Sequence, residues 1–69
     1  MKYKVEDVLV KGAESLTVHS YEAGIYLVEV DIAGVPGFVV DDDERFLRFN
    51  SPNAVKETFS HATVDKAWL

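Results

Sequence analysis

The alternation of apolar and polar side chains predicts several short strands in the first two thirds of the chain. Residues 15–21 alternate regularly and are rich in β-forming residues. Residues 25–32 predict the strongest strand, which is apolar throughout its first half, as is typical of a central strand, and alternates in its second half. Shorter runs predict two more strands, at about 38–41 and 46–50. Because the breaks between these segments are short, we expect neighbouring strands to pair as hairpins. The pattern therefore predicts an antiparallel β-meander of about four strands.

Helical spacing of apolar residues appears at two other places. Residues 4–11 carry apolar side chains three and four positions apart, and Gly12 follows as a stop. Ser51 and Pro52 are typical of a helix start, which predicts a second helix at about 52–61. Residues 63–68 alternate weakly and allow one further strand. We expect a single α+β domain over residues 1–69, with two short helices packed on the sheet.

The predicted elements suggest how a core forms in so short a chain. The second helix is expected to cover the face that carries Val28, Val30 and Phe49. Ile25 and Leu27 then belong to the opposite face. Two arrangements remain for that face: the N-terminal helix covers it, or a second copy of the protein covers it.

Composition excludes several classes of protein. The chain has 69 residues and no cysteine, so it contains neither a disulfide framework nor a thiolate zinc site. No apolar run approaches the ~20 residues of a membrane span. The N-terminus has two lysines but no apolar segment behind them, which argues against a secretory signal. We therefore expect a cytoplasmic protein that does not bind membranes.

Charge separates along the chain and indicates a type of partner. The net charge is −5, and no Lys or Arg occurs between Lys11 and Arg45. Such an acidic middle repels a phosphate backbone, so we expect no binding to nucleic acid. The prediction is a non-enzymatic protein-interaction module that binds a basic partner or another copy of itself. The candidate interaction surface consists of Ile25, Leu27, Glu29, Asp31, Asp41, Asp42, Asp43 and Glu44.

An alternative function uses the acidic run at 41–44 to bind a small ligand or a divalent cation. Clustered carboxylates suit Ca²⁺ and Mg²⁺, but the run lacks the alternating spacing of an EF-hand loop. His19 and His61 have no neighbour at metal-ligand spacing, and Ser51 is explained as a helix cap. The sequence contains neither a Gly-x-Ser-x-Gly elbow nor a phosphate loop. We therefore assign no catalytic residue, no cofactor and no metal ligand.

Two segments give the chain a family resemblance. Residues 24–30, Gly-Ile-Tyr-Leu-Val-Glu-Val, and residues 47–51, Leu-Arg-Phe-Asn-Ser, are followed by Ala54 in the second predicted helix. In this combination the chain resembles a group of small bacterial proteins known as a domain of unknown function. The resemblance spans about residues 14–69 and carries no catalytic motif. Where that group usually has a hairpin glycine, this chain has Asp43, Glu44 and Arg45.

Overall fold

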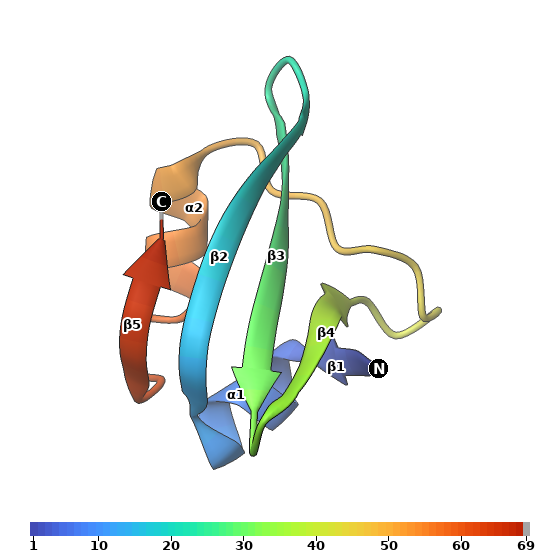
Figure 1. The fold of residues 1–69 in the computed structure, drawn as a ribbon. Helices are drawn as coiled ribbons and strands as arrows, with labels where there is room; N and C mark the ends of the chain where they lie inside the picture. The colour runs from blue at the N-terminus through green and yellow to red at the C-terminus, as the bar shows by residue number, and fades with distance from the viewer. Residues whose placement is uncertain (69) are drawn as a thin grey trace.

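The computed structural model describes residues 1–68 and has the predicted α+β architecture (Figure 1). Its five strands form one sheet in the order β1-β4-β3-β2-β5. In chain order the elements are β1 (Lys2–Lys4), α1 (Val5–Lys11), β2 (Ala13–Glu22), β3 (Ile25–Ile32), β4 (Val35–Val40), α2 (Pro52–Thr58) and β5 (Val64–Trp68).

The three central strands form the predicted antiparallel hairpins. β2 pairs with β3, for example Val18 with Val28, and β3 pairs with β4. The turn between β3 and β4 has Ala33 and Gly34 at its centre, with φ of 53° and 79°. Positive φ at both central residues is the geometry that matches the twist of a two-residue hairpin. The break between the strands predicted at 25–32 and 38–41 is therefore shorter than expected, and residues 35–37 belong to β4.

The sheet is mixed, which corrects the prediction of a purely antiparallel meander. β1 lies parallel to β4, and β5 lies parallel to β2. Both pairings have a helix between the paired strands in the chain, which gives the long connection that parallel strands need. β5 coincides with the further strand allowed at 63–68. β1 was not predicted, and its last residue, Lys4, was placed in the first helix.

The predicted strand at 46–50 is absent. Only two isolated backbone pairings occur there, Phe46 with Val40 and Phe49 with Tyr26. β4 already pairs with β3 at residues 29–32, so the segment 46–50 can pair with β3 only near its start, at Tyr26. The helix expected at 52–61 ends at Thr58.

Both helices pack on the same face of the sheet (Figure 1). Val8 of α1, together with Val55 and Phe59 at α2, belongs to one core cluster with Val28 and Val30. The second helix therefore covers the face that the pattern indicated. The N-terminal helix covers that face as well, and in the described part of the chain no helix lies over the opposite face of the sheet.

Candidate functional site

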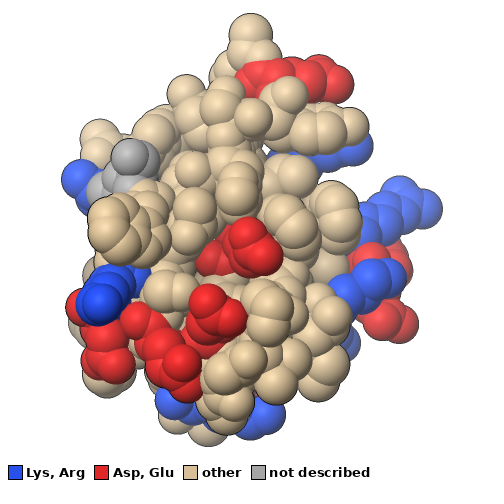
Figure 2. Space-filling model, viewed as in Figure 1, with Lys and Arg blue, Asp and Glu red and all other residues tan. Residues whose placement is uncertain are grey.

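The face of the sheet opposite the helices carries a group of polar, acidic and aromatic side chains that could bind a partner. We call it the open face. It is formed by outward side chains of the three central strands and by one ring from the following segment, namely Ser15, Thr17, His19, Leu27, Glu29, Asp31, Phe38 and Phe46. In Figure 2 carboxylates lie near the centre and lower left of this face, and most of the remaining visible surface carries no charged side chain.

Two side-chain contacts link β2 to β3 across the open face. His19 Nε2 lies 2.9 Å from Glu29 Oε1, and the Ser15 hydroxyl donates to Asp31 Oδ2 at 3.0 Å. The His19 and Glu29 side chains are 43% and 36% exposed. The contacts fix the direction of both carboxylates and leave them accessible. Sequence spacing did not pair these residues, because they lie on different strands.

An aromatic row crosses the same face. The His19 and Phe38 rings lie 5.6 Å apart, and Phe38 stacks on Phe46 at 4.9 Å. Leu27 and Val40 point to this side of the sheet and are buried, although neither belongs to the core beneath the helices. The open face thus has a small apolar layer of its own.

The candidate interaction surface predicted from sequence is divided in the structure. Glu29 and Asp31 are half-buried on the open face, and Ile25 is half-buried at the start of β3. Leu27 is only 6% exposed, so it cannot offer the contact surface that was expected of it. The continuous apolar sequence around Leu27 is typical of a central strand. Leu27 is buried because β3 lies between β4 and β2, whose side chains flank it on the open face.

The acidic run lies apart from these carboxylates, in the loop that follows β4. Asp41 organises this loop, since its Oδ1 accepts the amides of Asp43 and Arg45 at 2.9 and 3.0 Å. The Asp41 amide donates to the Arg45 carbonyl, and the Glu44 amide donates to the Asp41 carbonyl. Within residues 1–68, no group of three or more His, Asp or Glu side chains is placed to hold a metal ion.

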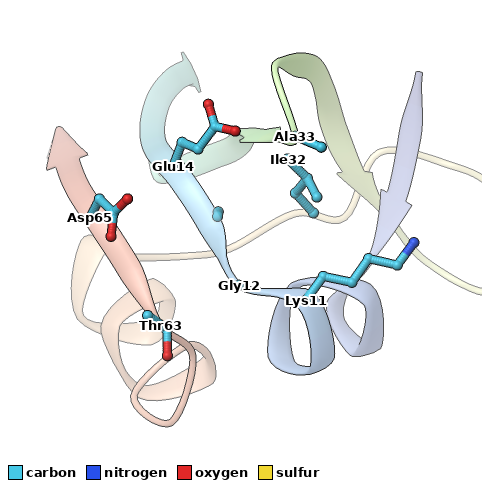
Figure 3. A pocket seen from close by; sticks show the side chains of 8 residues that line it. Lys11, Gly12, Glu14, Ile32, Ala33, Thr63 and Asp65 are labelled. Carbon is cyan, nitrogen blue, oxygen red and sulfur yellow. The ribbon is translucent and has the colours of Figure 1, made fainter.

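A hollow of about 410 Å³ lies where β2, β3 and β5 meet near α1 (Figure 3). Glu14 and Asp65 line one side of it, and the Glu14 carboxylate accepts the amide of Gly34 at 2.9 Å. A Cβ at Gly12 would lie 2.8 Å from the Thr63 carbonyl oxygen, so glycine is needed for β5 to approach β2 here. Glu14 was part of the acidic interval, but nothing in the sequence placed Asp65 beside it.

A second hollow, of about 430 Å³, was not predicted. Asp41, Arg45, Phe46 and Arg48 line it. The available signal in the sequence was the spacing of the two arginines around Phe46. His61 lies exposed after α2.

None of the helices within residues 1–68 has the length and apolar character needed to cross a membrane. Comparison with curated proteins and with solved structures gave no match. A family model described as a family of unknown function (DUF6482) matches residues 1–69. The match agrees with the resemblance seen in the strand and helix motifs, and the chain belongs to this family of unknown function.

Proposed function

We propose that the protein is a non-enzymatic interaction module that binds a basic segment of a partner protein on the open face. The observation that carries the proposal is that, within residues 1–68, no helix lies over this face, while half-buried carboxylates and aromatic rings lie on it. A sheet face normally buries its apolar side chains against another layer. Here Phe46 remains 47% exposed beside Phe38.

Charge supports a basic partner over a second copy at this face. β3 is the central strand of the sheet, and its outward charged residues are Glu29 and Asp31. Two copies packed face to face about the middle of the sheet would bring these carboxylates together, which is unfavourable. Lysine and arginine side chains would instead pair with the carboxylates and lay their alkyl stems or guanidinium planes on the rings.

Binding of an oligoarginine peptide, followed by fluorescence anisotropy, tests the proposal. We expect the Glu29→Gln/Asp31→Asn variant to bind about 2- to 10-fold more weakly, which is the usual effect of exposed charge pairs. Glu6→Gln/Glu57→Gln is the matched control, because it removes the same number of negative charges from exposed positions on α1 and α2, away from the open face. Raising the salt concentration should weaken wild-type binding.

Equal affinity of the double variant and the control would overturn the proposal. Sedimentation of the protein alone, at about 100 μM, addresses self-association separately, since weak contacts with Kd in this range are populated there. A dimer through the open face should become tighter in the Glu29→Gln/Asp31→Asn variant, because the repulsion between the carboxylates is removed, and this result would count against the proposal. A dimer whose affinity does not change in the variant would use another surface of the molecule.

A further inference from the structure

We propose that the hollow beside the 41–45 loop binds a small aromatic compound with one phosphate group, of the size of a mononucleotide. The hollow is lined by Arg45, Arg48, Phe46 and Asp41. This site goes beyond the binding of a basic segment proposed above, and it shares Phe46 with the open face. It combines two guanidinium groups with an exposed ring in a space of about 430 Å³, which lies within the usual range for small-ligand sites.

Both arginines are available for an anion. Arg45 and Arg48 are exposed, and within residues 1–68 neither arginine forms an ion pair. A guanidinium group offers a planar set of N–H donors that matches phosphate oxygens. Two such groups around one hollow can hold one phosphate from two sides.

The backbone that carries these side chains is fixed at regular intervals. The Arg45 amide donates to Asp41, the Leu47 amide to the Val39 carbonyl, and the Phe49 amide to the Tyr26 carbonyl. Arg45 and Arg48 therefore project from an anchored segment although they lie in a connection without regular secondary structure. The entropy lost on binding is confined mainly to their side chains.

Phe46 provides a surface for an aromatic ring. One side of it stacks on Phe38 with a centroid distance of 4.9 Å and an interplanar angle of 25°, and 47% of the residue stays exposed. Stacking on a fixed aromatic side chain accepts any planar base, and an adjacent guanidinium strengthens it. The ring and the arginines together therefore favour a ligand with both a planar group and an anion.

The acids of the loop limit the charge that the site accepts. Asp41 lines the hollow, but its Oδ1 already accepts two backbone amides. Asp42, Asp43 and Glu44 are exposed nearby and repel additional negative charge. We therefore expect a single phosphate to be preferred over a chain of phosphates.

Titration with AMP, followed through the backbone amides by NMR, tests the site. We expect the largest shifts at residues 45–48, and weaker binding of adenosine, inorganic phosphate and ATP. Arg45→Gln and Arg48→Gln should each weaken AMP binding about 5-fold or more. Lys56→Gln is the control, because Lys56 is an exposed cation on α2. Asp42→Asn/Asp43→Asn should strengthen AMP binding.

Three results would overturn the inference. AMP shifts that persist at full size in both arginine variants would place binding elsewhere. Adenosine or inorganic phosphate that binds as tightly as AMP would remove the need for one of the two groups. If 10 mM AMP causes no shifts at residues 45–48, the site itself is excluded, because a Kd of about 10 mM is the weakest expected of a specific site.

Discussion

Replacing Gly37 by alanine tests how closely the N-terminal strand packs on the sheet. A Cβ at Gly37 would lie 2.4 Å from the Met1 carbonyl oxygen and 2.9 Å from Cε2 of Tyr3. Both distances are shorter than real Cβ contacts, and the first involves backbone. The alanine methyl therefore forces β1 away from β4.

The expected loss in free energy of unfolding follows from the interactions that Tyr3 of β1 makes with the rest of the protein. Tyr3 is 5% exposed, and its hydroxyl donates to the Val35 carbonyl at 2.9 Å. Exposing the ring loses about 1.5–3 kcal/mol, and the hydrogen bond contributes about 0.5–1.5 kcal/mol. Alanine returns about 0.4–1 kcal/mol by restricting the unfolded chain. We expect a net loss of about 1–4 kcal/mol, a large share of the roughly 3–10 kcal/mol available to a domain of this size.

Urea unfolding monitored by circular dichroism measures the loss, and amide exchange at Lys2–Lys4 locates it. Gly24→Ala is the control, because Gly24 has φ 74° but no atom within 4 Å of a new Cβ. That variant should lose about 1–2 kcal/mol through backbone strain alone and keep β1 protected. A Gly37→Ala protein with unchanged stability and unchanged protection of β1 would refute the packing argument.

Other substitutions test the register, the caps and the loop. Val28→Asp should unfold the protein, because Val28 is fully buried and a lone charge there costs more than about 4 kcal/mol; Glu29→Lys should retain the native circular dichroism spectrum, and the reverse result would mean a register shifted by one residue. Ser51→Ala removes the hydroxyl that accepts the Ala54 amide at 3.1 Å and should lower the free energy of unfolding by about 1 kcal/mol, whereas an unchanged urea midpoint would contradict that cap. Glu44→Gly should raise the melting temperature, since Glu44 has φ 62° and relief of that conformation is worth about 0.5–1 kcal/mol; a lower melting temperature would contradict the strain.

Local pattern predicted the parts of the fold that depend on neighbours in the chain. The alternation in β3 and the cap at Ser51 are visible in the sequence, because each depends on the backbone geometry of residues that are adjacent in the chain. β1 has only three residues, Lys-Tyr-Lys, which is too short for a period to appear. Its pairing with β4 also depends on Gly37, which reads as a turn residue in sequence and instead makes room for Met1 and Tyr3.

The candidate site was predictable only in part for the same reason. Glu29 was correctly expected to lie away from the helix-covered core, because strand periodicity assigns faces. The contact between His19 and Glu29 and the stack of Phe38 on Phe46 join residues from different segments. One sequence does not specify which residue stands opposite which. Position along the chain likewise does not indicate that the acidic loop lies apart from Glu29 and Asp31 of β3.

The two parallel pairings imply an order of events during folding. β2, β3 and β4 are joined by tight turns, so their contacts close short loops. β1 and β5 instead pair with strands far along the chain, Lys2 with Phe38 and Ala13 with Val64. Closing a long loop costs more chain entropy and slows folding. The central three-stranded unit is therefore expected to form first, and the two ends of the described chain dock afterwards as the outermost strands.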